Sequence, residues 1–331
     1  MASSSLSVVL ILCLAAAASA QLSTTFYDKS CPLALEKIQN GVATAVKNDR
    51  RMAASLLRMH FHDCFVQGCD ASVLLNETSV GGNERGAFGN VGSLRGFEVI
   101  EQIKKDVEAV CKKPYSNHGP IVSCADILAV AARESVVTVK LGRRDSTMAS
   151  VTQVPSRRAR CIDQNLPAPF LGVAGLNASF VGKGFNLTDM VALSGGHTIG
   201  MAQCQNFRGR LYNESNINTT YATKLKFNCP QSGGNTNLAP LDDDTTIPPN
   251  PDLFNNDYFI NLQSEKGLLH SEQVLYNATA AAGATEDIVK AFASSQAAFF
   301  SAFASAMAKM ANLSPLTGSQ GQVRSVCSIP N

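Results

Sequence analysis

Hydrophobic side chains recur at three- and four-residue steps over much of this chain, which is the period of an amphipathic α-helix. The clearest run is 288–310, whose stripe on one helix face is formed, among many alanines, by Phe292, Gln296, Phe299, Phe303, Met307 and Met310. Residues 33–57 and 126–137 show similar spacing. No run alternates with a period of two for long enough to predict a sheet. We therefore predict an all-α, mainly helical fold.

The first 20 residues differ from the rest in carrying no Lys, Arg, Asp or Glu. They are apolar from Leu6 to Ala18 and end in Ala18-Ser19-Ala20, the small-x-small pattern of a cleavage site. We expect residues 1–20 to be a secretory signal peptide, and the mature chain to start at Gln21, a residue that can cyclise to pyroglutamate. No later apolar run reaches the length of about 18 residues that a membrane span needs.

Charge and cysteine content agree with a secreted protein. The 28 basic and 26 acidic residues nearly balance, which argues against nucleic acid or an anionic membrane as the main partner. Ten cysteines, one of them in the expected signal peptide, allow up to four disulfides and one leftover thiol in the mature chain. Several Asn-x-Ser/Thr sequons also favour a secreted glycoprotein: Asn76, Asn177, Asn186, Asn213, Asn218, Asn277 and Asn312.

The octet 58–65, Arg-Met-His-Phe-His-Asp-Cys-Phe, contains the first candidate chemistry. On a helix Arg58 and His62 share a face, because they are four positions apart. Such a pair can take a proton at one atom and stabilise negative charge that develops on the next. Two other interpretations stay open for this segment alone: a metal site through His60 and His62, or a histidine of the core.

A second candidate lies downstream, in Ser-Gly-Gly-His-Thr at 194–198. Gly195 and Gly196 remove side-chain bulk beside His197, which would let a flat ligand approach the backbone. A neutral imidazole is a good iron ligand, and a carboxylate on its other nitrogen would increase its basicity. A structural histidine is the alternative.

Together these segments resemble the secreted haem peroxidases of plants, the class III family. The resemblance extends over nearly all of residues 21–331, through ordered blocks at 21–32, 58–72, 93–97, 122–128, 141–145, 166–170, 191–200 and 313–327. It implies the haem peroxidase fold, with two interleaved helical domains and the haem between them. The distal part would be about 21–163 and the proximal part about 164–310, with the C-terminal segment returning to the distal part.

The resemblance assigns a role to each candidate residue. His62 corresponds to the base that moves a proton of hydrogen peroxide, Arg58 to the group that stabilises charge, and Asn90 to the residue that orients His62. His197 corresponds to the ligand of the ferric haem b iron. Pro167 corresponds to a residue that contacts small phenolic donors. The implied protein is a monomeric peroxidase of the cell wall or apoplast.

Two calcium ions and four disulfides are also implied by the resemblance. The ligands of calcium 1 would be Asp63, Val66, Gly68, Asp70 and Ser72, with Glu84 through a water. Those of calcium 2 would be Thr198, Asp243, Thr246 and Asn255. The pairs would be Cys31–Cys111, Cys64–Cys69, Cys124–Cys327 and Cys204–Cys229, which leaves Cys161 unpaired in a surface loop. Asp126 and Arg143 would form a buried ion pair rather than two solvated charges.

This chain departs from the family pattern in places. Glu272 replaces the aspartate expected beside the iron ligand, which would displace its hydrogen bond to His197 by one methylene. Asn255 replaces an aspartate at calcium 2, and an insertion is expected at 247–250. Three segments have unusual lengths: 112–123, 138–140, where a Trp-containing block is missing, and 153–161.

Two competing functions remain open at the level of the sequence. One is a secreted haem and calcium glycoprotein with little or no peroxidase turnover. The other is a zinc hydrolase that uses His60 and His62, although no third ligand stands at the spacing of such enzymes.

Overall fold

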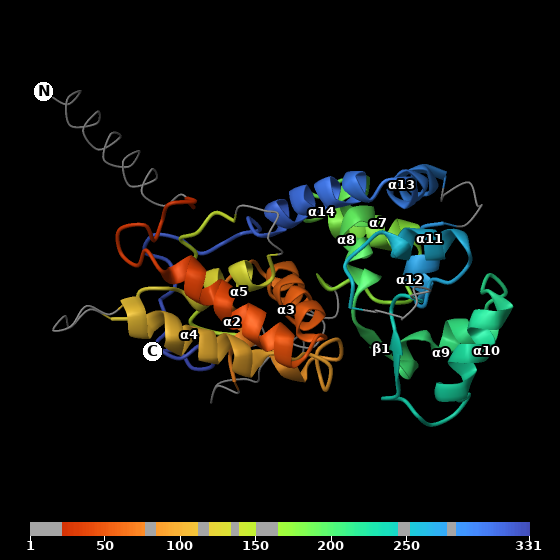
Figure 1. The fold of residues 1–331 in the computed structure, drawn as a ribbon, viewed down its shortest axis with the longest axis horizontal. Coiled ribbons are helices and arrows are strands. Elements are labelled where there is room, and N and C mark those ends of the chain that lie inside the picture. The colour runs from red at the N-terminus through yellow and green to blue at the C-terminus, as the bar shows by residue number, and fades with distance from the viewer. Residues whose placement is uncertain are drawn as a thin grey trace, which may run out of the picture. The chain divides into compact units, whose positions relative to one another are not determined.

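The structure is a computed structural model that describes residues 22–76, 84–111, 119–133, 139–149, 165–243, 252–276 and 283–331. The expected signal peptide, Gln21 and Cys161 lie outside these residues. Within them, helices dominate and the sheet is a single pair of short strands (Figure 1). The prediction of a mainly helical fold is confirmed. In the described part of the chain, no helix has both the length and the apolar character needed to cross a membrane.

The chain forms two compact units. The first comprises residues 1–47, 58–162 and 310–331, and the second comprises 48–57 and 163–309. The helices that lie wholly or mainly in the first unit are α2 (Ala34–Asn48), α3 (Met52–Val66), η1 (Ser72–Leu74), η2 (Glu84–Gly86), α4 (Phe97–Cys111) and α5 (Cys124–Ala131).

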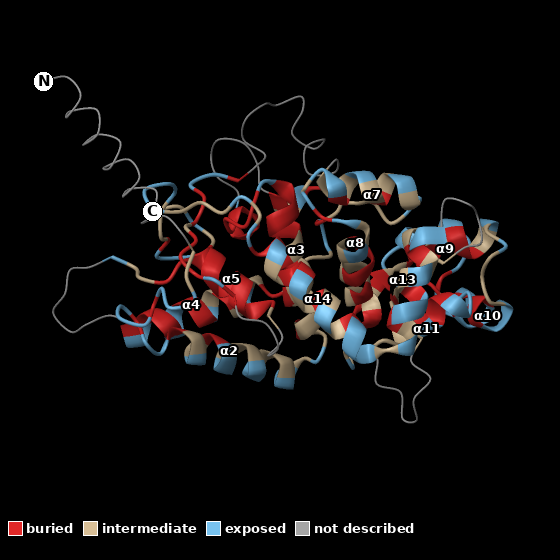
Figure 2. Cartoon of the chain, turned by 90° about the horizontal axis from the view of Figure 1, so that it is seen from above, coloured by how far each residue is buried: buried red, intermediate tan, exposed pale blue. Residues whose placement is uncertain are grey.

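Helix α5 is the centre of the first unit, since every one of its residues is buried (Figure 2). The Ser123 side chain caps its first turn by accepting a hydrogen bond from the Asp126 backbone N–H at 3.1 Å. Asp126 then accepts 2.8 Å hydrogen bonds from the Tyr27 hydroxyl and from Arg143. Arg143 is fully buried and also donates to the Ala311 carbonyl at 3.0 Å. The structure therefore shows Asp126 and Arg143 as a buried pair and not as two solvated charges.

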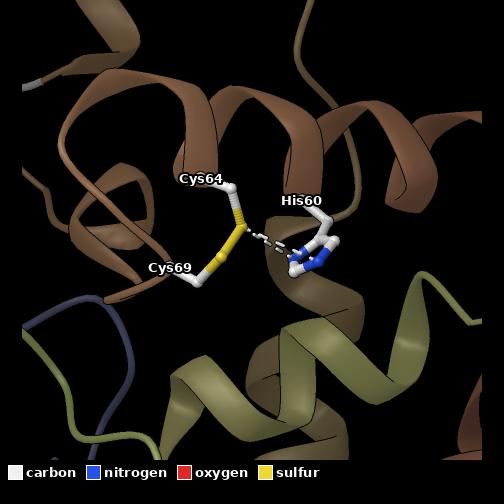
Figure 3. Close-up of side chains that lie close together, drawn as sticks. All are labelled: His60, Cys64 and Cys69. Atoms are coloured by element: carbon white, nitrogen blue, oxygen red, sulfur yellow. Dashed lines mark hydrogen bonds between the residues drawn. A yellow bond between two sulfur atoms is a disulfide. The ribbon is translucent and has the colours of Figure 1, made fainter. Parts of the chain in front are cut away.

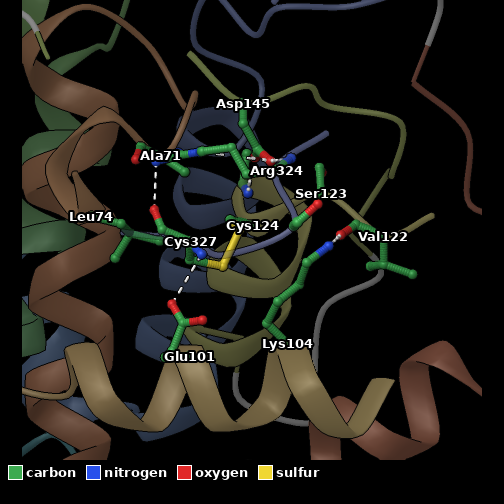
Figure 4. Close-up of a disulfide and its surroundings, with 12 residues drawn as sticks. Ala71, Leu74, Glu101, Lys104, Val122, Ser123, Cys124, Asp145, Arg324 and Cys327 are labelled. Carbon is green, nitrogen blue, oxygen red and sulfur yellow. Dashed lines mark hydrogen bonds and ion pairs between the residues drawn. A yellow bond between two sulfur atoms is a disulfide. The ribbon is translucent and has the colours of Figure 1, made fainter. Parts of the chain in front are cut away.

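The C-terminal segment is fastened to the first unit by the Cys124–Cys327 disulfide (Figure 4). Beside it, buried Arg324 donates to the carbonyls of Cys327 and Ala71 at 2.5 and 2.6 Å. The Cys327 backbone N–H donates to Glu101 of α4 at 2.9 Å. These bonds join the last residues of the chain to α4, α5 and the loop that follows α3.

The second unit has the following elements: α7 (Val173–Val181), α8 (Leu187–Ser194), η4 (Gly195–Thr198), β1 (Met201–Gln203), α9 (Cys204–Asn213), α10 (Thr219–Asn228), β2 (Leu238–Pro240), α11 (Asp257–Gln263), α12 (His270–Gln273), α13 (Gly283–Ser294) and α14 (Gln296–Met310). The strands are antiparallel, with Ala202 opposite Ala239. Each has three residues, too few for the alternating pattern that predicts a strand from sequence.

A cluster of phenylalanine rings forms part of the core of this unit. The Phe259 ring lies 4.9 Å from that of Phe299 and 5.1 Å from that of Phe292, and the Phe254 and Phe303 rings are 4.9 Å apart. Edge-to-face and tilted pairs at such distances stabilise a core beyond the area that they bury. The apolar stripe predicted for residues 288–310 is therefore core.

Three predicted helices have different limits in the structure. The run 288–310 is divided between α13 and α14 at Ser295, whose hydroxyl accepts from the Ala298 backbone N–H at 3.2 Å, and Gln296 is exposed. The run 33–57 is divided at Asp49, whose carboxylate accepts from the Arg51 backbone N–H at 3.0 Å. Side chains that hydrogen-bond nearby backbone favour helix ends, and hydrophobic spacing does not register them. The third, α5, begins at Cys124 and ends at Ala131.

Candidate active site

His62 lies on helix α3 and is 6% exposed. Its side chain has one hydrogen-bond partner in the described part of the chain. The His62 Nδ1 lies 2.5 Å from the Asn90 Oδ1, and the Asn90 amide donates to the Glu84 carbonyl at 2.8 Å. Because an amide oxygen only accepts, the proton of a neutral His62 is on Nδ1 and the lone pair is on Nε2. Asn90 therefore fixes the tautomer that a base requires.

Arg58 lies one helical turn before His62. It donates to the Gly89 carbonyl at 2.7 Å and to the Ser93 hydroxyl at 3.1 Å, so residues 89–93 supply partners to both side chains. Desolvation lowers the pKa of Arg58 to about 10, which leaves it charged at neutral pH. Burial, and secondarily the charge of Arg58, hold the pKa of His62 well below 6.5, while the bond to Asn90 raises it in part. The structure thus combines a neutral base with a fixed cation.

His197 lies in the short helix η4, and its imidazole has a carboxylate partner. Its Nδ1 is 2.6 Å from the Glu272 Oε1, and the other carboxylate oxygen accepts from the Leu269 backbone N–H at 2.8 Å. The Glu272 side chain is 2% exposed, whereas the His197 side chain is 43% exposed. The longer acid therefore reaches His197, and the displaced bond expected from the extra methylene is not found.

The nitrogen Nε2 of His197 has no hydrogen-bond partner among the described residues. An exposed imidazole with one carboxylate-bound nitrogen and one free nitrogen fits a haem iron ligand. Packing gives one of the two glycines beside it a reason of its own. A Cβ at Gly195 would lie 2.6 Å from the Phe259 and Phe299 rings, so packing against the phenylalanine cluster requires that glycine.

Residues 63–72 form a buried group of oxygen atoms. The Asp63 carboxylate accepts from the Ala71 backbone N–H at 3.0 Å, and the Asp70 carboxylate accepts from that of Ser72 at 3.0 Å. Burial, followed by the charges of Asp70 and Glu84, raises the pKa of Asp63 well above its usual value. The Ser72 hydroxyl is buried and makes no hydrogen bond in the described part of the chain. Such a group of buried carboxylate and hydroxyl oxygens fits a calcium ion, and the charge of Arg324 also acts on Asp63 and Asp70.

The backbone of this segment also explains Gly68. Its φ is +127°, a conformation that side chains rarely adopt, and a Cβ there would overlap the Ser314 carbonyl. Val66 is the last residue of α3, and Glu84 is fully buried at the start of η2. All six residues expected at calcium 1 thus lie in the first unit.

The residues expected at calcium 2 are brought together only in part. The Thr198 hydroxyl donates to the Asn255 side-chain oxygen at 2.9 Å and lies 3.3 Å from a carboxylate oxygen of Asp242. Asp243, the expected ligand, instead forms ion pairs of 2.6 and 3.0 Å with Lys224 and Lys266. Thr246 lies outside the described residues.

Sequence reasoning therefore missed Asp242. The Asp-x-x-Thr spacing that selected Asp243 with Thr246 also fits Asp242 with Thr245. Asp242 is 5% exposed, and its carboxylate also accepts from the Asn261 amide.

His60 is separate from His62 in its contacts. Its ring nitrogens lie 3.6 and 3.7 Å from the Cys64 sulfur, which is bonded to Cys69 (Figure 3). Among the described residues, these three are the one group of His, Cys, Asp or Glu side chains whose ligand atoms all lie within 4.8 Å of one another, and two of them are consumed by the disulfide. His62 is not part of it. The arrangement gives no support to a zinc site built on both histidines.

The remaining expected features are placed as follows. The structure contains the four disulfides that the resemblance implies: Cys31–Cys111, Cys64–Cys69, Cys124–Cys327 and Cys204–Cys229.

Pro167 is half-buried, and the carbonyl of the nearby Pro169 accepts a hydrogen bond from the Ser271 backbone N–H at 3.0 Å. Residues 112–118, 134–138 and 150–164, which contain most of the irregular segments, lie outside the described residues, as do 247–250.

Comparison with known proteins gives a consistent result. The family model described as Peroxidase matches residues 38–295. Peroxidase 2 of Oryza sativa subsp. japonica is 54% identical, and the alignment covers 99% of each chain. A peroxidase of Triticum aestivum is 56% identical over 99% of this chain and 98% of its own. Peroxidase 1 of Hordeum vulgare is 52% identical over the whole of both. The chain therefore belongs to the peroxidase family and is a class III plant peroxidase.

Proposed function

We propose that this peroxidase is secreted and reduces hydrogen peroxide with electrons from small phenolic donors, with His62, Arg58 and Asn90 as its catalytic residues and His197 as the haem iron ligand. The observation that carries the proposal is the pair of hydrogen bonds at Nδ1 of the two histidines. Asn90 fixes the tautomer of His62 that leaves Nε2 free to act as a base, and Glu272 gives His197 the character of a metal ligand.

On the distal side, the Nε2 of His62 accepts a proton from one oxygen of hydrogen peroxide and returns it to the other oxygen, which leaves as water. Arg58 stabilises the negative charge that develops as the O–O bond breaks, and it remains charged because its pKa is about 10. A base and a cation one helical turn apart on α3 suit this division of work.

On the proximal side, Nε2 of His197 would hold the iron of haem b, which is ferric at rest. The Glu272 carboxylate accepts a hydrogen bond from the protonated Nδ1 of the same ring. A carboxylate in that place increases the basicity of the imidazole and lowers the reduction potential of the iron. The haem, when bound, supplies the redox chemistry: two electrons to peroxide, recovered one at a time from two phenolic donors. Pro167 would contact those donors.

We further propose that two calcium ions are bound. Calcium 1 would use Asp63, Val66, Gly68, Asp70 and Ser72, with Glu84 through a water, supported by the buried oxygen atoms described above. For calcium 2, we replace Asp243 by Asp242 beside Thr198 and Asn255, because Asp242 and not Asp243 contacts the Thr198 hydroxyl. Thr246 remains an expectation. Metal analysis should find two calcium ions per chain, whereas one ion would exclude the second site.

The location and processing are part of the same proposal. Residues 1–20 would be removed as a signal peptide, and the peroxidase domain would start at Gln21, cyclised to pyroglutamate. The protein would act outside the cell as a monomer. The distal part would span about 21–163 and the proximal part about 164–310. Mass spectrometry of the N-terminal peptide and the elution volume of the protein purified from plant tissue check these points.

The decisive experiment is the absorption spectrum of the purified protein before and after one equivalent of hydrogen peroxide, followed by addition of guaiacol. A Soret band that changes with peroxide and recovers with guaiacol is expected. A Soret band without guaiacol oxidation would favour the alternative of a haem and calcium glycoprotein without turnover. Zinc in place of iron would overturn the proposal.

A further inference from the structure

The carboxylate that bonds His197 is carried by α12, a helix of only four residues. Isolated helices of that length are unstable, so tertiary contacts must hold it in place. The position of α12 also sets the position of Glu272. The contacts of the other α12 residues therefore bear on His197, although they do not touch it.

Side-chain contacts hold α12 at both ends, in addition to the hydrogen bond from the Ser271 backbone N–H to the Pro169 carbonyl at 3.0 Å. At its end, buried Gln273 donates to the Leu262 carbonyl at 2.9 Å and accepts from the Gly267 backbone N–H at 3.0 Å. At its start, His270 Nδ1 lies 2.7 Å from the Glu214 carboxylate. Apart from the Glu272–His197 pair, this is the one ion pair that α12 makes with other described residues.

Glu214 is itself held firmly. It directly follows the last residue of α9, and its second carboxylate oxygen lies 2.8 Å from buried Arg210. Arg210 donates in turn to the Gly267 carbonyl at 2.9 Å and to the Asn216 side chain at 2.7 Å. The Glu214 carboxylate is thus a fixed bridge from α9 to the first residue of α12.

We propose that the His270–Glu214 pair positions Glu272 and thereby sets the reduction potential of the iron that His197 would hold. The inference rests on the proposed function. Glu272 accepts from the Leu269 N–H, the residue next to His270, so fraying of this first turn would release one carboxylate oxygen and loosen the 2.6 Å bond from the other to His197. A weaker bond makes His197 less basic, which raises the potential.

The test compares ferric/ferrous potentials of haem-loaded variants. His270→Ala and Glu214→Gln should each shift the equilibrium toward ferrous iron by about three- to tenfold, where tenfold corresponds to about 59 mV for one electron. His270→Gln keeps a side-chain donor near Glu214 and should restore part of the change. Glu286→Gln, which breaks the partly exposed Glu286–Lys290 pair of α13, is the matched control and should change neither the potential nor the iron–histidine stretch.

Resonance Raman of the ferrous proteins supplies a second measurement, since the iron–histidine stretch should fall in the same order as the potentials rise. If Glu272→Gln shifts both quantities but His270→Ala and Glu214→Gln match the control, the positioning role is wrong and the proposed function stands. If the wild-type iron is not bound by His197, the proposed function fails instead. A variant that loses its fold is recognised by its melting temperature. In that case the remaining two of His270→Ala, Glu214→Gln and His270→Gln decide the test.

Discussion

The two histidines of the proposed active site have the same contact and different electrostatics. His62 Nδ1 meets the Asn90 amide oxygen at 2.5 Å, and His197 Nδ1 meets the Glu272 carboxylate oxygen at 2.6 Å. His62 is almost fully buried beside a cation, whereas the His197 side chain is 43% exposed. A neutral acceptor fixes the tautomer without adding charge, while a carboxylate also increases the basicity of the ring. In the proposed function, the kind of acceptor at Nδ1 therefore distinguishes the proton carrier His62 from the iron ligand His197.

The largest effect should come from removing the base. In His62→Ala the reaction with peroxide should slow by about a hundred- to ten-thousand-fold, because the proton transfer is lost while His197 still binds iron. Stopped-flow rates with an unchanged Soret band check this. Rates within tenfold of wild type would show that His62 is not the base.

Asn90→Asp would make the distal pair resemble the proximal one. A carboxylate beside His62 should raise its pKa by about one to three units. In the wild type the pKa of His62 lies well below 6.5, so the peroxide rate should stay constant until the pH falls through that low value. In the variant the decline should begin at higher pH. The control is Asn40→Asp on the exposed face of α2, and equal pH profiles in all three proteins would contradict the prediction.

His60 shows how burial affects the pKa of a histidine whose ring nitrogens lie near a sulfur atom instead of an oxygen acceptor. Burial, followed by the charge of Arg143, lowers the pKa of His60 from 6.5 to about 3. Between these values the unfolded chain binds a proton that the folded chain does not, so stability falls as the pH falls from 6.5 to 3, by up to about 1.4 kcal/mol per unit. His60→Gln should make this decline shallower in denaturant unfolding. An unchanged slope would show that His60 is protonated in the folded protein.

The smallest effect should come from Glu272→Asp. The sequence predicted that the extra methylene of Glu272 would displace its hydrogen bond to His197, but the glutamate accepts hydrogen bonds from both His197 and the Leu269 N–H. If the α12 backbone keeps its place, the shorter aspartate moves the carboxylate away from His197. The ferric/ferrous potential should therefore rise, with a change of less than about tenfold in the equilibrium constant for reduction. Spectroelectrochemical titration measures it. A lower potential would mean that α12 moves to suit the shorter side chain.

The sequence alone determined the helical class and the candidate side chains, because hydrophobic period and motif spacing are local properties. The spacing of four positions from Arg58 to His62 predicted that both lie on one face of a helix, and the structure places both on α3. The helix breaks at Asp49 and Ser295 were missed, since side-chain caps there override a continuous apolar stripe.

Only the tertiary structure shows how the contacts of the neighbouring acids Asp242 and Asp243 differ. Asp243 pairs with Lys224 and Lys266, while Asp242 is directed to Thr198, although both fit the same sequence spacing. Likewise, the number of methylenes in Glu272 could not predict its reach to His197, because that depends on where α12 is held by residues 214 and 273. The sequence identifies the candidate side chains, whereas the packing of distant segments decides which of these side chains come into contact.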